Sequence, residues 1–363
     1  MSILRNKKIL FIHFGPSSFV CEDLKILRKT HNVQEFYFNV NKSKSIITTT
    51  LTYLNSYITQ IVWLLRHAPK ADIIYCWFAD FHAFVPAIVS KVCKIPLLVV
   101  LGGVDGVSNK ELNYGVFTSK WRAPINRFVI KNANFLLPVD DSLIKAKSIA
   151  KHWGEAYPNG IKHHIPNLNI NWLELPTGYD SKLWAMGNEN RPKSVLTVAL
   201  INSNKRFRIK GIDLLLKSSI YLPDYTFTII GIGKEMHSFI NQEYKLGNNV
   251  ILLPPLPRKE LVSHYKNASL YAQLSRSEGL PNVLCEAMLC GCIPIGSPVF
   301  GIPKAILDPE LIVYKPDPKL IADTIIFAHE KFNSQRGQFR EHIDKNYSIE
   351  IREQKLLSLI DDY

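Results

Sequence analysis

Short apolar runs alternate with longer helical patterns along the first half of the chain. The runs have the length and composition of buried strands, and they cover residues 8–14, 33–40, 72–78, 96–102 and 133–139. In the segments between them, apolar residues recur three and four positions apart, which predicts helices over 17–30, 49–66, 83–93 and 118–131. Strands that alternate with helices predict a parallel sheet with both faces covered.

A segment rich in turn residues, at 165–193, interrupts this alternation before it resumes. The second series predicts strands over 194–200, 226–231, 249–253, 270–274 and 293–297, and helices over 211–220, 234–245 and 258–267. We therefore predict an α/β protein of two facing, doubly wound, Rossmann-like domains with a cleft between them. The first domain is expected over 1–185 and the second over 186–346, with a C-terminal helix at 347–363 that packs back on the first domain.

Ligands bind beyond the carboxyl ends of the strands in sheets of this kind. In the first half, several candidate positions follow predicted strands: Gly15, Pro16, Asp80, His82, Gly103 and Asp105. His13 lies at the end of the first strand and is a further candidate. A lone histidine at such a position is more often structural than functional.

Two acids interrupt the apolar stretch SEGLPNVLCEAMLCGCIPIG at 277–296. The apolar spacing after Pro281 and a later glycine predict a short helix over 282–290. Glu278 then lies on the loop before the helix, and Glu286 lies just over one turn inside it. The free N–H groups at the helix start favour an anion, and carboxylates accept hydrogen bonds from hydroxyl groups. A phosphorylated, polyhydroxylated ligand fits this pattern, and the structural alternative is a helix-dipole acid with one surface acid.

A basic segment, NSNKRFRIKGIDLLL, follows the first strand of the second domain and is expected to be a loop before a helix. It contains four cations: Lys205, Arg206, Arg208 and Lys210. Cations at the amino end of a helix oppose its dipole, and a bound diphosphate would relieve that cost through charge-assisted hydrogen bonds. The alternative is a solvated basic loop. Gly231 and Gly233 fit a tight turn that lets the backbone approach a ligand, but the third glycine of a dinucleotide fingerprint is missing.

Charge is unevenly distributed along the 363 residues. The net charge is +13, and residues 1–175 contribute +10 of it, with 21 Lys and Arg against 11 Asp and Glu. This asymmetry points to an anionic membrane surface, a lipid diphosphate or a nucleic acid. A nucleic acid is disfavoured because no recognisable binding module is present. The mixed aromatic and basic stretch 114–131 is either a surface helix packed on the sheet or a helix lying on an anionic membrane.

The six cysteines have neither a disulfide framework nor zinc-ligand spacing. We expect them to be buried, reduced thiols and expect no bound metal. The sequence has no evident secretory signal and no apolar stretch of about 20 residues that would span a membrane. These features predict a cytoplasmic protein, with contact at the inner face of the membrane as an extension of its basic first half.

The run SRSEGLPNVLCEAMLCGCIPIGSPVFGIP, preceded in order by LPTGYDSKLW, KGIDLLL and IIGIGKE, resembles the family 4 group of retaining glycosyltransferases with the GT-B fold and the E-x7-E signature. The resemblance implies an acceptor-binding first domain and a second domain that binds a nucleoside-diphosphate sugar without a metal or other cofactor. Two positions depart from the family pattern: Gly102 replaces a common histidine, and Lys304 replaces a common glutamate.

The resemblance also implies roles for individual residues. Lys210 and Arg206 would bind the donor diphosphate, with Arg208 or Lys205 as alternatives to Arg206. Glu278 would contact the donor sugar, and Glu286 would bind the ribose. Further donor-binding positions are implied at Gly279, Leu280, Pro281, Asn282, Val283, Gly231, Pro255 and Leu256, the last two in the loop 254–258 that borders the base. The acceptor side is implied at Gly15, Pro16, His82, Gly103 and Asp105.

We therefore expect a retaining glycosyltransferase that moves a hexose from a nucleoside-diphosphate sugar to a glycan or a lipid-linked acceptor. The expected setting is the biosynthesis of a cell-envelope polysaccharide or lipopolysaccharide. The alternatives are a sugar-nucleotide epimerase or another enzyme of the same architecture, such as a phosphorylase, and, more remotely, a non-enzymatic nucleic-acid-binding protein.

Overall fold

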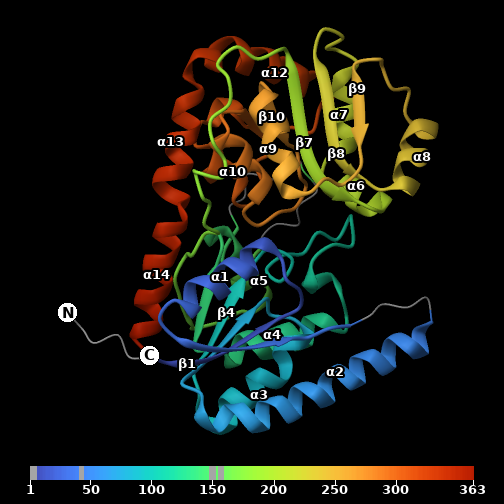
Figure 1. Cartoon of the computed structure of the whole chain (residues 1–363). Coiled ribbons are helices and arrows are strands. Elements are labelled where there is room, and N and C mark those ends of the chain that lie inside the picture. Colours follow the sequence, from blue (N-terminus) through green and yellow to red (C-terminus); the bar gives the residue numbers. More distant parts are fainter. Residues whose placement is uncertain (1–5, 41–44, 147–152, 154–158) are drawn as a thin grey trace.

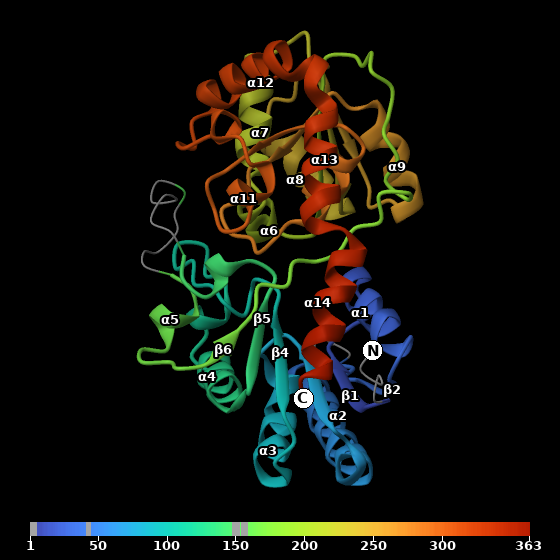
Figure 2. The ribbon, with the colours of Figure 1, turned by 90° about the vertical axis from the view of Figure 1, so that its left-hand side faces the viewer.

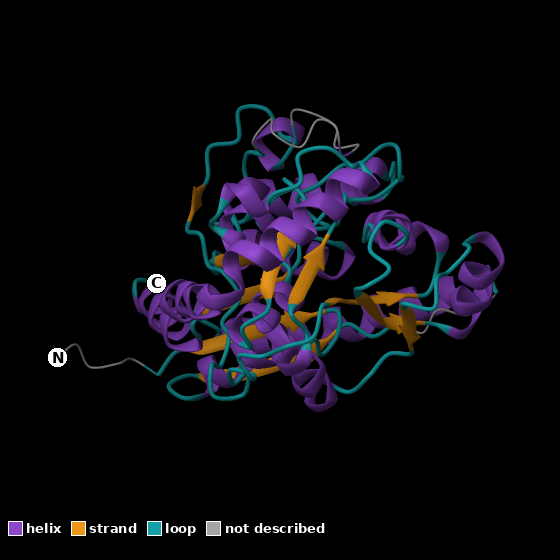
Figure 3. Cartoon of the chain, turned by 90° about the horizontal axis from the view of Figure 1, so that it is seen from above, coloured by secondary structure: helices purple, strands orange, loops and turns teal. Residues whose placement is uncertain are grey.

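Two parallel sheets, one above the other, organise the molecule (Figure 1). The computed structural model describes residues 6–40, 45–146, 153 and 159–363. Helices flank both sheets, as the view from above shows (Figure 3). The predicted class, an α/β protein of two Rossmann-like domains, is confirmed.

The first sheet has the strand order β2-β1-β3-β4-β5-β6, and every pair is parallel. Its strands are β1 (Lys8–His13), β2 (Asn32–Tyr37), β3 (Ile73–Trp77), β4 (Leu97–Leu101), β5 (Phe135–Pro138) and β6 (Asn171–Trp172). The helices of this domain are α1 (Ser18–Arg28), α2 (Ile46–His67), α3 (Phe84–Cys93), α4 (Arg122–Asn132) and α5 (Ile161–His164). Every residue of β3 and β4 is buried, which explains why these strands are continuous apolar runs.

The second sheet has the order β11-β10-β7-β8-β9 and is also parallel throughout. Its strands are β7 (Ser194–Ile201), β8 (Thr226–Ile232), β9 (Val250–Leu253), β10 (Leu270–Gln273) and β11 (Ile293–Gly296). Its helices are α6 (Asn204–Ile209), α7 (Ile212–Ser219), α8 (Lys234–Glu243), α9 (Arg258–Asn267), α10 (Asn282–Leu289), α11 (Ile302–Ile306), α12 (Pro318–Phe332) and α13 (Arg336–Tyr347).

The basic segment after β7 is a helix rather than the expected loop. Ser203 is the N-cap of α6, and its side chain accepts a hydrogen bond of 3.3 Å from the Arg206 N–H. A serine before a new turn is an ordinary helix start, and here it outweighs the unfavourable charges at that end. Three of the four cations therefore project from a short helix, and Lys210 follows directly after it.

The chain returns from the second domain to the first at its C-terminal end (Figures 1 and 2). Helix α13 runs along the second domain, and α14 (Ile349–Asp361) lies beside α1 of the first. Arg352 of α14 bonds to both carboxylate oxygens of Asp23 in α1, at 2.6 Å and 2.7 Å. Asp23 also accepts bonds from Tyr75 and Trp77, at 2.7 Å and 2.8 Å. This buried, fully bonded pair ties the C-terminal helix to the first sheet.

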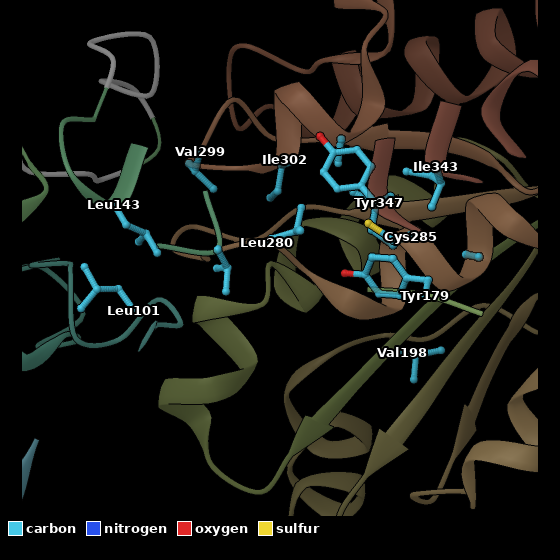
Figure 4. Packing of buried hydrophobic residues seen from close by; sticks show 14 of the residues in the cluster. Leu101, Leu143, Tyr179, Val198, Leu280, Cys285, Val299, Ile302, Ile343 and Tyr347 are labelled. Atoms are coloured by element: carbon cyan, nitrogen blue, oxygen red, sulfur yellow. The ribbon is translucent and has the colours of Figure 1, made fainter. Parts of the chain in front are cut away.

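Buried apolar side chains form one cluster that continues from one domain into the other. Figure 4 shows part of it, with Leu101 and Leu143 from the first domain and Leu280 and Ile302 from the second. Leu280 belongs to the loop before α10, so this loop is anchored by its apolar side chain while its neighbours remain available for polar contacts.

All six cysteines are free thiols. Four of them are buried as expected: Cys76, Cys285, Cys290 and Cys292. The expectation is wrong for Cys93, which is exposed at the end of α3, and for Cys21, which is partly exposed.

None of the described helices combines the length and the apolarity that crossing a bilayer requires.

The pair between Arg352 and Asp23 makes a stability prediction. Its side chains are 1% and 0% exposed, so Arg352→Ala leaves a buried carboxylate without its counter-ion. We expect the free energy of unfolding, measured in urea, to fall by about 3–5 kcal/mol. Lys29→Ala is the matched control, because Lys29 pairs with Glu353 at the exposed edge of the same two helices and should cost about 1 kcal/mol or less. Equal losses in the two variants would contradict this account of α14.

Candidate active site

Helix α10 and the loop before it form the centre of the candidate site. Pro281 is the N-cap, one position before the first turn in which it was expected. At the other end Gly291 has φ +82°, a left-handed conformation that glycine adopts without strain, so the predicted stop is confirmed. Glu278 lies on the loop and Glu286 inside α10, as predicted. Neither is a surface acid, since their side chains are 13% and 5% exposed.

Glu278 forms an ion pair with Lys210. Lys210 Nζ lies 2.8 Å from Oε1 and 2.6 Å from Oε2 of the carboxylate. Gly211 positions the lysine: it has φ +68°, and a Cβ there would collide with the carbonyl of Leu274 at the end of β10. Only glycine lets these backbones approach so closely. Lys210 is thereby held next to the loop of Glu278, and two of the residues predicted to contact the donor are in direct contact with each other.

Glu286 pairs with a different cation, Arg258, which is the first residue of α9. The guanidinium reaches Oε1 of Glu286 through Nε at 3.1 Å and Nη2 at 2.6 Å, and it lies 4.9 Å above the ring of Trp184. Burial raises the pKa of Glu286 to about 7, and Arg258 only partly opposes this shift. Because Arg258 is 43% exposed, part of its charge is solvated and it stabilises the buried carboxylate incompletely.

The cations of α6 differ in their partners. Arg208 bonds to Glu111 at 3.1 Å, and Lys205 donates to the carbonyl of Asn113, so both reach loops of the first domain. Arg206 is exposed, and among the described residues its guanidinium has no hydrogen-bond or ion-pair partner. Of the three candidates for a second phosphate-binding cation, Arg206 is therefore the one whose side chain is available.

The two domains touch through glycine backbones beside this ion pair. A Cβ on Gly279 would lie 2.5 Å from the carbonyl oxygen of Gly102, and one on Gly103 would lie 3.2 Å from the N atom of Gly279. Asp105 shapes the first-domain side, because its carboxylate accepts hydrogen bonds from the N–H groups of Gly102 and Gly103 at 3.1 Å and 3.0 Å and from Ala79 at 3.2 Å. Asp105 is fully buried, and burial raises its pKa to about 6. It therefore holds the glycine turn rather than facing the space between the domains.

A pocket of about 240 Å³ lies between the domains, beside α10. Ser18 and Phe19 at the amino end of α1 line one side of it, and Arg258 and Asn282 line the other. Asn282 Oδ1 accepts hydrogen bonds from Thr177 and Tyr179 of the connecting segment, both at 2.8 Å. The amino ends of two helices thus border one pocket, where free N–H groups favour an anionic ligand.

Other predicted positions have distinct surroundings. Gly15, which precedes Pro16 and α1, has open space around it, so a ligand can approach its backbone. His82 is buried, and its Nε2 lies 2.6 Å from the carbonyl oxygen of Trp77. The side chain therefore makes a structural hydrogen bond and is not exposed to a ligand. Gly231 lies inside β8, where a Cβ would collide with the carbonyl of Ala199. Its glycine is explained by contact between strands, not by the expected turn.

The loop that was expected to border a base does precede α9. Pro255 is exposed and Leu256 is partly buried. Val283, in the first turn of α10, is also partly buried. Pro255 and Leu256 lie near Arg258 along the chain, and a ligand is not needed to explain the packing of Leu256 or Val283.

Sequence reasoning missed Arg258 as an individual residue, although it ends the segment 254–258. It also missed Tyr114, whose pKa is raised first by burial and then by the charges of Glu278 and Asp105. Tyr114 therefore lies within electrostatic range of the carboxylates of both domains. A tyrosine in a turn-rich loop has no distinctive pattern, so the sequence offered no signal for it.

Lys304, which departs from the family pattern, ties the domains together. Its ammonium bonds to Glu174 and lies 3.8 Å from Asp141. Asp140, Asp141 and Glu174 have oxygens within 4.8 Å of one another, an arrangement that divalent cations can use. The lysine lies against this acidic group, so its positive charge already compensates the carboxylates.

Residues 188–346 match the family model described as Glycosyl transferases group 1. The matched residues take in nearly all of the second domain's sheet and helices, and they make up less than half of the chain. D-inositol 3-phosphate glycosyltransferase of Mycobacterium sp. (strain JLS) is 33% identical over 222 residues, which are 59% of this chain and 48% of the relative. The chain thus spans about half the length of that relative. An uncharacterized glycosyltransferase of Methanocaldococcus jannaschii is 28% identical over 286 residues, which are 77% of this chain and 72% of the relative.

Solved structures resemble the whole described fold. Sucrose-phosphate synthase from Thermosynechococcus elongatus has a TM-score of 0.70 at 15% identity, with 98% of each chain covered. Anabaena HepE, in a complex with UDP-glucose, has a TM-score of 0.68 at 15% identity, with 98% of this chain and 100% of HepE covered. The group 1 domain therefore belongs to a GT-B fold, as predicted.

The raised pKa of Glu286 makes a prediction about pH. Its folded-state pKa is about 7, above the ordinary value of 4.5, so the folded protein holds this proton more tightly than the unfolded chain. Stability must then fall as pH rises through that window. Glu286→Gln removes the contribution, so its melting temperature relative to wild type should increase between pH 5 and pH 8. Glu260→Gln, on the exposed side of α9, is the control. If the difference in melting temperature between Glu286→Gln and wild type does not change with pH, the pKa of Glu286 is not raised in the folded protein.

Proposed function

We propose that the chain is a retaining glycosyltransferase that takes a sugar from a nucleoside diphosphate and transfers it to an acceptor on the first domain. The observation that carries the proposal is the pair of shielded carboxylates, Glu278 and Glu286, each held by one cation on either side of the start of α10. Two acids and two separable cations suit a ligand that has hydroxyl groups at both ends and a diphosphate between them.

In this proposal the diphosphate takes Lys210 away from Glu278 and also binds Arg206, whose side chain is exposed. The N–H groups at the start of α10 complete an anion-binding site that needs no metal. Glu278, once released, accepts hydrogen bonds from the sugar. Glu286 accepts them from the ribose after Arg258 moves aside, a motion that the partial exposure of Arg258 allows.

The transfer breaks the bond between the anomeric carbon and the diphosphate oxygen, and the diphosphate leaves with the bonding electrons. The acceptor oxygen bonds to the same carbon, and its proton passes to the oxygen of the departing diphosphate. Preorganised positive charge at Lys210 and Arg206 stabilises the leaving group, which is the largest electrostatic change in the reaction. The turn Gly102–Gly103 stands where relatives often have a histidine, and its backbone groups face the loop of Glu278.

We further propose a glycan or lipid-linked acceptor of the cell envelope, with the basic first domain in peripheral contact with an anionic membrane at its cytoplasmic face. The names of two relatives support an acceptor that is a phosphorylated polyol or a lipid. One is the D-inositol 3-phosphate glycosyltransferase of Mycobacterium sp.. The other is a phosphatidylinositol N-acetylglucosaminyltransferase subunit of Arabidopsis thaliana, which is 23% identical over 43% of this chain. UDP-sugars are the first donors to test, because HepE was solved with UDP-glucose. Product analysis separates transfer from the epimerase alternative, in which the sugar stays on the nucleotide.

Release of nucleoside diphosphate from candidate sugar nucleotides tests the proposal. Lys210→Ala and Glu286→Ala should each lower turnover about 10²-fold or more, because each removes a group that binds or stabilises charge in the donor. Lys217→Ala, an exposed cation on α7, is the matched control and should keep wild-type activity. If Lys210→Ala and Glu286→Ala both have wild-type rates, these residues do not take part in donor binding or transfer.

The assignment of Arg206 makes a separate prediction. Calorimetric titration with UDP should show that Arg206→Ala weakens binding roughly tenfold to a hundredfold, the scale of a hydrogen bond to a charged group. Arg208→Ala should change affinity by less than about threefold, since Arg208 already pairs with Glu111. The reverse order would mean that Arg208 supplies the second phosphate contact.

A further inference from the structure

Helix α2 presents a row of apolar side chains to solvent, and two of its three buried residues are polar. Its buried residues are Ser56, Gln60 and Leu64. Ser56 donates to the carbonyl of Asn39, and Gln60 Nε2 donates to the carbonyl of His82 at 2.8 Å. A surface helix of a globular protein normally has the opposite arrangement, with its apolar face inward. Polar bonds and the ring contacts of Tyr57 and Trp63 anchor the helix, and its exposed apolar row lacks a partner among the described residues.

The apolar face consists of side chains three and four positions apart on one side of α2, all between 52% and 84% exposed: Ile46, Ile47, Leu51, Leu54, Ile58, Val62 and Leu65. Figure 1 shows α2 at the outer edge of the first domain, with one end extending past the other helices. Scattered exposed apolar residues are common, but a contiguous row of this length marks an interaction surface.

An apolar groove adjoins this face. Its volume is about 850 Å³, and it lies between α2 on one side and α3 and α4 on the other. The lining is aromatic and aliphatic: Thr50, Tyr53, Tyr57, Ile61, Phe81, Phe84, Val85, Trp121 and Ile125. Trp121, at the start of α4, is 83% exposed. Exposed face and groove together form one lipid-sized apolar surface, here called the α2 surface.

The helices around the α2 surface contribute only cations, and Asp80, the acid whose charge acts on Tyr53 and Tyr57 of the groove, is paired with Arg122. Helices α2, α3 and α4 contain no Asp or Glu, and their cations are Arg66, Lys91, Arg122, Arg127 and Lys131. Apolar side chains flanked by Lys and Arg are the pattern of a helix that lies in the interface of an anionic bilayer. A second copy of the chain fits less well, because pairing two such surfaces would bring like charges together.

The groove ends near the candidate active site. Arg122, next to Trp121, bonds to Asp80 through Nε at 3.2 Å, and Asp80 follows β3 at the carboxyl edge of the first sheet. The charges of Arg122, Arg206 and Glu278 all act on Tyr114, so the two places are within electrostatic range of each other. A lipid chain in the groove would therefore lie beside Arg122, within electrostatic range of the candidate site.

We propose that the α2 surface docks on an anionic lipid bilayer, with the apolar row of α2 inserted at the interface and the groove open to the chain of a bilayer lipid. The link to a lipid-linked acceptor rests on the proposed function, which this proposal extends. The main membrane contact is then α2, and not the aromatic and basic stretch 114–131. Binding itself is independent of catalysis.

Co-sedimentation of the full chain with vesicles tests the docking. Vesicles of phosphatidylcholine and phosphatidylglycerol in a 70:30 ratio should bind the protein, and pure phosphatidylcholine should bind it roughly tenfold more weakly, because each basic residue near an anionic surface gains about 1 kcal/mol. Leu51→Ser with Leu54→Ser should lower binding to the mixed vesicles about tenfold or more, since inserted side chains of this size contribute strongly. Both positions are exposed, so folding is preserved.

Ile220→Ser with Leu307→Ser is the matched control, because these side chains are 66% and 67% exposed on the second domain. It should bind vesicles like wild type. Equal binding by both double variants, or no binding by wild type, overturns the proposal. Light scattering gives a further test. If the wild type is a dimer and the double variant Leu51→Ser with Leu54→Ser is a monomer, the proposal is also overturned, because a second copy of the chain then covers the α2 surface.

UDP titration of the same samples keeps the two proposals apart. Vesicle binding without any nucleotide binding would sustain the α2 surface and defeat the proposed function. Nucleotide binding without vesicle binding would sustain the donor site and sugar transfer, and it would defeat both the α2 surface and the membrane contact. Glu286→Gln should bind vesicles like wild type, which excludes an indirect effect of the donor site.

Discussion

The candidate site depends on a contact between two glycine turns. The backbones of Gly102 and Gly103 in one domain meet Glu278 and Gly279 in the other at distances that leave no room for a Cβ. This approach fixes where the loop of Glu278 lies and how near the first domain comes to the start of α10. Any side chain at 102 would meet the ring of Phe78, so the turn in this chain is adapted to glycine. Closure of the domains and the geometry of the acids are therefore one structural feature.

Electrostatics give the same region its chemistry. Among the described residues each of the two shielded acids has one cationic partner, and these partners come from separate elements: Lys210 follows α6, and Arg258 begins α9. Such pairs are costly to bury and easy to exchange for a ligand that offers both phosphate and hydroxyl groups. By contrast, the pair between Arg352 and Asp23 has every bond satisfied within the fold and no access to solvent, so it contributes structure alone. Burial and accessibility separate the two kinds of ion pair.

Much of the fold could be predicted because parallel strands buried on both faces are continuous apolar runs, as β3 and β4 show. Helix α10 was predictable because Pro281 and Gly291 delimit it. Helix α6 was not, since four cations conceal an ordinary serine cap. The partners of Glu278 and Glu286 were also beyond the sequence: Lys210 depends on the close approach at Gly211, and Arg258 on the placement of α9. The polar inner face of α2 depends on which side of the helix meets the sheet, and periodicity alone does not decide that.

A crystal structure of the full chain with a bound nucleoside diphosphate tests the central claim most directly. The account predicts the diphosphate between Arg206 and the start of α10, with Lys210 Nζ moved from Glu278 to a phosphate oxygen and the ribose hydroxyls on Glu286. A nucleotide bound elsewhere, with the Lys210–Glu278 and Arg258–Glu286 pairs unchanged, would contradict it.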